Sequence, residues 1–260
     1  MDATIWLKGV APLAVLLSVV ALSWESESGK WHYRATVGSD LHGGVQMGVK
    51  DDNCDNAEDN LEVDWNGDPS DYTCDKPPYQ SNIRKDVEIP EEECETLLDP
   101  PLHKCMSEAI LYDDPLPTSG AHRPLWAKFG EYTYLPRQRW LHNLEHGCAV
   151  FLYHPCADRG EVGRFKRLAR SCLRKHIITP LKDLSRETPF AVLTYGCKLL
   201  LPYVDTFRIE QFLREHALDA PEQDLTKDGQ FKQGLLEPAA IVSDLKDSVI
   251  CPPDFEDELL

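Results

Sequence analysis

No Cys-x-x-C pair, no Asn-x-Ser/Thr sequon and no glycine-rich phosphate loop occurs in this sequence of 260 residues. The first absence disfavours zinc ribbons and thioredoxin-like motifs, the second disfavours N-glycosylation, and the third leaves a nucleotide-binding fold without its usual signature. Basic residues are scarce too, because 27 Lys and Arg stand against 44 Asp and Glu, for a formal net charge of −17. Such a surface repels phosphates, so we expect no nucleic-acid partner.

Long apolar runs are missing as well, apart from one near the N-terminus. Lys8 precedes an apolar run over 9–22, and Ala21 and Ser23 are small residues at the −3 and −1 positions of a cleavage site. This run is short for a membrane span and typical of a secretory signal peptide, which we predict over 1–23. An uncleaved signal anchor is the alternative. We expect the mature chain to be secreted, or luminal in the secretory pathway, with no membrane span after cleavage.

Nine cysteines in an exported chain are typical of disulfide bonding. They are Cys54, Cys74, Cys94, Cys105, Cys148, Cys156, Cys172, Cys197 and Cys251. Their spacing does not determine which of them pair. Because their number is odd, either one thiol is free or one bridge joins two chains, so a disulfide-linked dimer is possible in principle.

The periodicity of apolar residues predicts three strands and three helices in the central part of the chain. The strands are expected at 131–135, 148–153 and 190–195, and the helices at 138–146, 158–176 and 206–217. Short strands separated by helices indicate an α+β fold, a compact disulfide-stabilised domain with a small, mostly antiparallel sheet and flanking helices. A doubly wound α/β fold is the alternative.

Composition divides the chain into four parts. After the signal peptide, residues 24–95 are predicted to form an irregular, acidic, disulfide-tied region, in which 51–75 is expected to be a solvated acidic loop. The central α+β domain is expected over 96–225, with a short helix after Pro100-Pro101. Residues 226–260 form a C-terminal extension, packed on the domain or trailing it, in which we expect one short helix.

The best functional clue lies inside the predicted helix 138–146. His142, Glu145 and His146 have the spacing His-x-x-Glu-His, which puts all three on one side of a helix. The same spacing occurs in inverted zinc peptidases, where the two histidines bind zinc and the glutamate acts as the base. The short motif alone is also compatible with structural histidines, Glu145 then pairing with a neighbouring arginine.

A third imidazole is available from the proline-rich loop before the helix. We predict a metal site with His122, His142 and His146 as ligands, and Glu145 as a residue that orients a ligand or as a catalytic base. Three imidazoles suit zinc or copper equally well. The alternative is a non-catalytic protein-interaction domain with an unknown protein partner, and a lesser one is a metal-dependent hydrolase. His32 and His42 are expected to be ordinary polar surface.

Three motifs resemble the ectodomain of the tumor protein p53-inducible protein 13 family, which shares this domain with secreted bacterial proteins of unknown function. In order they are PTSGAHRPLWAKFGEY, QRWLHNLEHGCAVFLYHPC and TYGCKLLLPYVDTFRIEQFLREHALDAPE, within roughly 105–222. The shared positions include His122, His142, Glu145 and His146. The resemblance implies a link to growth suppression and negative regulation of the cell cycle, and supplies no mechanism. The membrane-spanning segment of vertebrate members is not expected here.

Overall fold

Seven strands and three α-helices form the described part of the chain in the computed structural model. The structure describes residues 31–34, 41–79 and 92–253, so the predicted signal peptide lies outside it. The helices are α1 (Arg137–Glu145), α2 (Arg159–Cys172) and α3 (Thr206–His216). The strands are β1 (Glu93–Cys94), β2 (Gly130–Tyr132), β3 (Ala149–Tyr153), β4 (His176–Pro180), β5 (Phe190–Thr194), β6 (Cys197–Leu201) and β7 (Leu235–Pro238). Two 3-10 turns, Leu61–Val63 and Pro69–Asp71, lie in the acidic segment.

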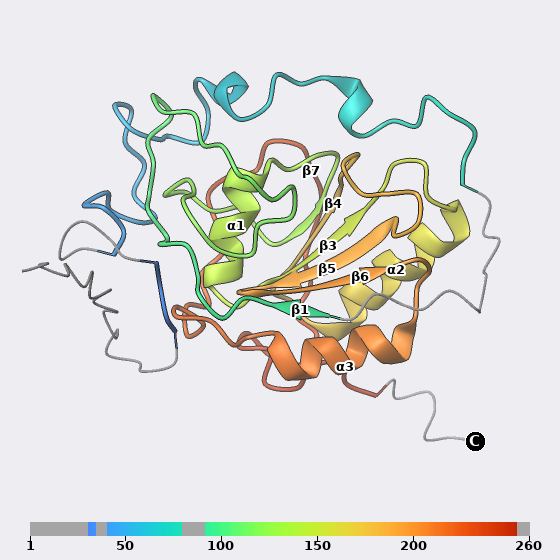
Figure 1. Ribbon diagram of the computed structural model, residues 1–260. Coiled ribbons are helices and arrows are strands. Elements are labelled where there is room, and N and C mark those ends of the chain that lie inside the picture. Colours follow the sequence, from blue (N-terminus) through green and yellow to red (C-terminus); the bar gives the residue numbers. More distant parts are fainter. Residues whose placement is uncertain (1–30, 35–40, 80–91, 254–260) are drawn as a thin grey trace, which may run out of the picture.

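The strands make one mixed sheet in the order β1-β6-β5-β3-β4-β2-β7. Strand β4 runs parallel to both of its neighbours, β2 and β3, and the other four pairings are antiparallel. Helix α1 covers one face of the sheet, and α2 and α3 lie against the opposite face (Figure 1). This arrangement confirms the predicted α+β fold with a mostly antiparallel sheet.

Each face of the sheet buries its own apolar core, because successive side chains of a strand point to opposite sides. From β3, Val150 and Leu152 pack into the cluster that contains Trp140 and Leu144 of α1. The alternate residues of β3 pack with α2 and α3 on the other face, in the cluster that contains Phe165. Helix α1 therefore packs against the sheet with one side, and its opposite side faces the N-terminal loops.

The short helix expected after Pro100-Pro101 does not form, which corrects the prediction. The carbonyl groups of Lys104, Cys105 and Glu108 accept hydrogen bonds from the guanidinium group of Arg123, and the segment makes a single turn in which the nitrogen of Glu108 donates to the carbonyl of Cys105 (3.0 Å). The helix predicted over 158–176 is also too long. It ends at Cys172, because Leu173 has extended backbone angles (φ −160°, ψ 151°) and β4 follows.

Most of the acidic segment is exposed, as expected of a solvated loop, but two of its carboxylates are buried against the domain. Asp55 is fully buried in an ion pair with Arg139 of α1 (Nη1–Oδ2 2.6 Å). Asp64 is buried as well and binds Arg123 through both of its oxygens. Both arginines belong to the central domain, so two buried charge pairs fasten the N-terminal region to it.

Eight of the nine cysteines form disulfide bonds. The pairs are Cys54–Cys105, Cys74–Cys156, Cys94–Cys197 and Cys172–Cys251. The first two join the acidic segment to the domain, and the last joins the C-terminal extension to the end of α2. Cys148 is the free cysteine and is fully buried. Of the two alternatives for the odd cysteine, the folded chain therefore has the free thiol.

The C-terminal extension packs on the domain through β7, which pairs with β2, and through Asp247. The buried carboxylate of Asp247 accepts hydrogen bonds from the main-chain nitrogens of Arg174 and Lys175. The helix expected in this extension is absent from the described residues up to 253. No helix in the described ranges has the length and apolar character needed to cross a membrane.

Candidate metal centre

Helix α1 carries two of the side chains at the candidate site, His142 and Glu145, on the side away from the sheet. The helix ends at Glu145, with His146 as its C-terminal cap and Gly147 in the left-handed region (φ 79°). A Cβ atom at Gly147 would lie 2.9 Å from the Cα atom of Leu218, so only glycine allows this close approach. The turn of chain after α3 is thereby brought against the end of α1.

Three irregular segments lie side by side over α1 and carry one histidine each. The main-chain nitrogen of His103 donates to the carbonyl of His42 (3.0 Å). On the other side, the nitrogen of Lys104 donates to the carbonyl of His122 (2.9 Å). Main-chain pairing therefore puts the three histidines in one row across neighbouring segments, which local periodicity in the sequence cannot reveal.

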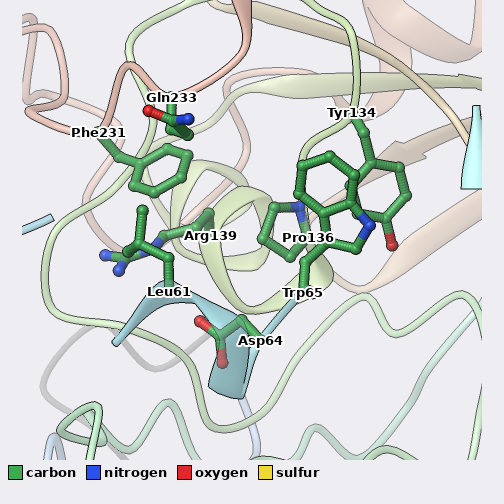
Figure 2. Close-up of a pocket in the computed structure, with 8 residues that line it drawn as sticks. All are labelled: Leu61, Asp64, Trp65, Tyr134, Pro136, Arg139, Phe231 and Gln233. Carbon is green, nitrogen blue, oxygen red and sulfur yellow. The ribbon is translucent and has the colours of Figure 1, made fainter. Parts of the chain in front are cut away.

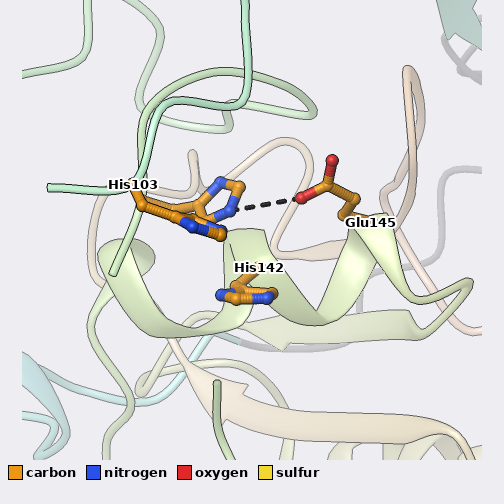
Figure 3. Close-up of side chains that lie close together, drawn as sticks. His103, His142 and Glu145 are labelled. Atoms are coloured by element: carbon orange, nitrogen blue, oxygen red, sulfur yellow. Dashed lines mark ion pairs between the residues drawn. The ribbon is translucent and has the colours of Figure 1, made fainter. Parts of the chain in front are cut away.

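Two imidazole rings from these segments, and a third from the end of α1, gather around His142. The centroid of the His142 ring lies 4.5 Å from that of His122, 5.0 Å from that of His103 and 4.8 Å from that of His146. Figure 3 shows His142 and Glu145 projecting from α1 toward the segment that carries His103. One possible ligand atom from each of His103, His122, His142 and Glu145 lies within 4.8 Å of the other three. We call these four residues the inner group.

Each imidazole of the inner group is oriented by a main-chain carbonyl. The Nδ1 atom of His103 binds the carbonyl of Val45 (2.7 Å), that of His122 binds Gly120 (2.9 Å), and that of His142 binds Arg123 (2.6 Å). A carbonyl oxygen only accepts, so every Nδ1 atom carries a proton, and in the neutral ring Nε2 then presents a lone pair. This is the tautomer and the orientation found in histidines that bind metals through Nε2.

The inner group is deeply buried and its inward-facing atoms have no hydrogen-bond partner. All four side chains belong to residues at most 3 % exposed. The Nε2 atoms of the three histidines and Oε2 of Glu145 form no hydrogen bond. Leaving one buried polar group unsatisfied costs about 1–3 kcal/mol, so four such atoms together need an explanation. A cation bound among them would satisfy all four.

The protonation states fit a cation as well. Burial, and then the neighbouring ring of His122, lower the pKa of His103 to about 4. The same two causes lower the pKa of His142 well below its ordinary value. Burial opposes the ionisation of Glu145, but the rings of His122 and His42 outweigh it and lower the pKa of this carboxyl to about 2. Near neutral pH His103 and His142 are therefore neutral and Glu145 is an anion, as metal ligands must be.

An outer group adjoins the inner one at Glu145. It consists of His42, His146 and Glu222. The Nε2 atom of His42 lies 3.2 Å from Oε1 of Glu145, and the Nδ1 atom of His146 lies 3.3 Å from Oε2 of Glu222. Glu222 is positioned by its main-chain nitrogen, which donates to the carbonyl of Glu145 (3.0 Å).

Of the predicted site residues, the structure brings His122, His142 and Glu145 into the inner group. The ring of His146 lies outside the inner group and faces Glu222. His103, His42 and Glu222 were missed. His42, expected to be ordinary polar surface, is half-buried against Glu145, which corrects that expectation. The sequence offered one hint for two of the missed residues, which is that each stands close to a residue that constrains the chain. His103 stands two residues before Cys105, and Glu222 directly follows Pro221.

A separate pocket lies where the acidic segment meets the start of α1 (Figure 2). It is lined by Leu61, Asp64, Trp65, Tyr134, Pro136, Arg139, Phe231 and Gln233. None of these residues belongs to the inner or the outer group. The predicted pairing of Glu145 with an arginine is also not found, because Arg139 pairs with Asp55 and Arg137 with Asp183.

Comparison with known families gives one match. Residues 103–229 match the family described as "Protein of unknown function (DUF3105)", so a DUF3105 domain is present and spans the inner group and Glu222. No curated protein and no solved structure matches the chain. None of these comparisons links the chain to the tumor protein p53-inducible protein 13 family, so growth suppression stays a prediction.

Proposed function

We infer that this domain binds a zinc or copper ion, with His103, His122, His142 and Glu145 as ligands, in an exported protein. Four disulfide bonds support an oxidising compartment. Compared with the ligand set expected from the sequence, His103 joins His122 and His142, and Glu145 becomes a ligand. His146 is assigned to a neighbouring role, argued in the next subsection.

The observation that carries this proposal is the contact between His122 and Glu145. The Nε2 atom of His122 lies 3.3 Å from Oε2 of Glu145, and both side chains are almost fully buried. Because Nδ1 of His122 already donates to Gly120, a neutral His122 ring directs the lone pair of Nε2 at an anionic oxygen. Two buried acceptors facing each other repel, unless a proton or a cation lies between them. The same holds for the lone pairs of His103 and His142.

The donor set favours a transition metal over calcium or magnesium. Three imidazole nitrogens and one carboxylate oxygen suit zinc or copper, whereas calcium and magnesium prefer oxygen alone. Four protein donors also fill a tetrahedral zinc site, as in structural sites, while catalytic zinc keeps one position for water. We therefore favour metal binding without hydrolysis at the inner group, where Glu145 acts as a ligand and not as a base.

Metal analysis of the full chain, purified without a histidine tag, tests the proposal. We expect close to one equivalent of zinc or copper in the wild type after dialysis, measured by mass spectrometry of the elements. His142→Asn removes the Nε2 atom and keeps an amide donor for the carbonyl of Arg123, so we expect it to lose that ion.

The matched control is His176→Asn. His176 is also fully buried and also binds a main-chain carbonyl through Nδ1, that of Leu173 (2.6 Å), but it lies outside both groups. We expect this variant to keep the ion. If the wild type and His142→Asn carry the same negligible zinc and copper after reconstitution, the histidines are structural, and the alternative of a protein-interaction domain takes the place of this proposal.

A further inference from the structure

We propose that the outer group holds a second divalent transition-metal ion, and that Glu145 bridges the two ions with one oxygen on each. The inference rests on the proposed function, because the inner ion supplies one side of the bridge. The ligands of the second ion are His42 and Glu222, together with Oε1 of Glu145, and His146 faces Glu222 beside them.

The two oxygens of Glu145 face different neighbours. Oε2 lies 3.3 Å from Nε2 of His122 in the inner group, and Oε1 lies 3.2 Å from Nε2 of His42 in the outer group. A carboxylate so placed between two sets of nitrogen donors has the geometry of a bridging ligand. Carboxylate-bridged metal pairs lie about 3.5–4 Å apart in two-metal sites.

Glu222 supplies the second carboxylate of the outer group. Its Oε1 atom lies 3.8 Å from Nε2 of His42, and its Oε2 atom lies 3.3 Å from Nδ1 of His146. One ligand atom from each of His42, Glu145 and Glu222 lies within 4.8 Å of the other two. A cation between the carboxylates of Glu145 and Glu222 would offset the repulsion between them.

His146 gives independent support for a ligand at this place. The residue is 1 % exposed, and neither of its ring nitrogens has a hydrogen-bond partner. A buried histidine with two unsatisfied ring nitrogens, one of them 3.3 Å from a carboxylate oxygen, is costly without a cation.

The His-x-x-Glu-His motif of α1 thus serves both ions through Glu145. His142 binds the inner ion, and His146 faces Glu222, a ligand of the outer ion. The two positions differ in access, because the side chains of His42 and Glu222 are 27 % and 24 % exposed, whereas those of the inner group are almost completely buried. The outer ion therefore borders solvent, keeps room for water ligands and exchanges faster than the inner one.

Zinc titration of the metal-free full chain by calorimetry tests the inference. We expect the wild type to bind two equivalents of Zn²⁺, one tight and one weaker. Glu222→Gln and His42→Asn should each lose the weaker equivalent and keep the tight one. The controls are Glu210→Gln, whose carboxylate is similarly exposed (29 %) and pairs with Arg214, and His154→Asn, a half-buried histidine elsewhere. Both controls should keep two equivalents.

The outcomes separate this inference from the proposed function. If the wild type binds one equivalent of zinc and His142→Asn loses it, the second site is overturned and the first site remains. Two equivalents that persist in both Glu222→Gln and His42→Asn also overturn it. A wild type that binds none overturns both sites.

Paramagnetic resonance with Cu²⁺ tests the bridge itself. After the second equivalent, the signal per copper should fall in the wild type, since ions that share a carboxylate couple magnetically. An undiminished signal per copper would show two separate ions and overturn the bridge.

Discussion

Arg139 and Asp55 form a fully buried ion pair between the motif helix and the acidic N-terminal region, 84 residues apart in the sequence. Asp55 also accepts a hydrogen bond from the main-chain nitrogen of Leu125, and Arg139 donates to the Leu125 carbonyl. The pair therefore fixes α1 against the loop that carries His122. The position of the histidines depends on a residue that lies well before the matched family region.

Removing the charge of Asp55 should destabilise the whole fold. Asp55→Asn leaves the buried guanidinium group of Arg139 without a counter-charge, which typically costs about 3–5 kcal/mol. We expect a loss of this size in the free energy of unfolding, measured by urea denaturation. Asp52→Asn, at an exposed position of the same segment, should change it by less than about 0.5 kcal/mol. A loss below about 1 kcal/mol in Asp55→Asn would contradict the structural role of the pair.

Metal should stabilise the wild type and fail to stabilise a ligand variant. At a free zinc concentration about one hundred times Kd, binding to the native state adds about 2.7 kcal/mol to the free energy of unfolding. His103→Asn keeps a donor for the carbonyl of Val45 and lacks Nε2, so its unfolding midpoint should be nearly independent of zinc. Unfolding with and without zinc measures the difference. Equal stabilisation of both proteins would remove His103 from the ligand set.

The metal-free protein should lose stability in acid through its buried histidines, of which His176 is the simplest case. Burial lowers the pKa of His176 from 6.5 to about 4. Between these values the unfolded chain binds a proton that the native chain does not, so stability falls as the pH falls. For one residue the difference amounts to about 3 kcal/mol. His176→Asn should flatten the pH dependence of unfolding by one proton over this window, and an unchanged slope would contradict the assignment.

The thiol of Cys148 should be inaccessible in the native protein. Its side chain is fully buried, and burial raises the pKa of the thiol well above its ordinary value. We expect no reaction with a thiol reagent under native conditions and one equivalent in denaturant. Cys148→Ser should not react with the thiol reagent in either condition. Reaction of one equivalent in the native state, or a disulfide-linked dimer that disappears in Cys148→Ser, would contradict the buried position.

Two of the helices and one strand with a clear apolar period were predicted almost to the residue. The helices expected at 138–146 and 206–217 are observed at Arg137–Glu145 and Thr206–His216, and the strand expected at 190–195 at Phe190–Thr194. Strand β4 was missed, and the helix predicted over 158–176 runs into its first residue, His176. The edge strands β1 and β7 have two and four residues, too few for a period to show.

The candidate site could be predicted only in the part that lies on a helix. His142, Glu145 and His146 share one turn of α1, so their spacing was visible in the sequence. His103 and His42 come from segments without regular structure, and long-range main-chain pairing determines their place. Glu222 follows α3 and reaches the site through the close contact at Gly147. Such relations depend on tertiary structure and leave no local pattern.

The bond between Cys54 and Cys105 has a consequence for the order of events after synthesis. Cys105 stands two residues from His103, and its carbonyl binds Arg123, the neighbour of His122. Two of the imidazoles are thus held in place by a covalent ring that exists only after the thiols have been oxidised. A newly made, still reduced chain lacks that ring, so the proposed ion should bind the oxidised chain more tightly than the reduced one.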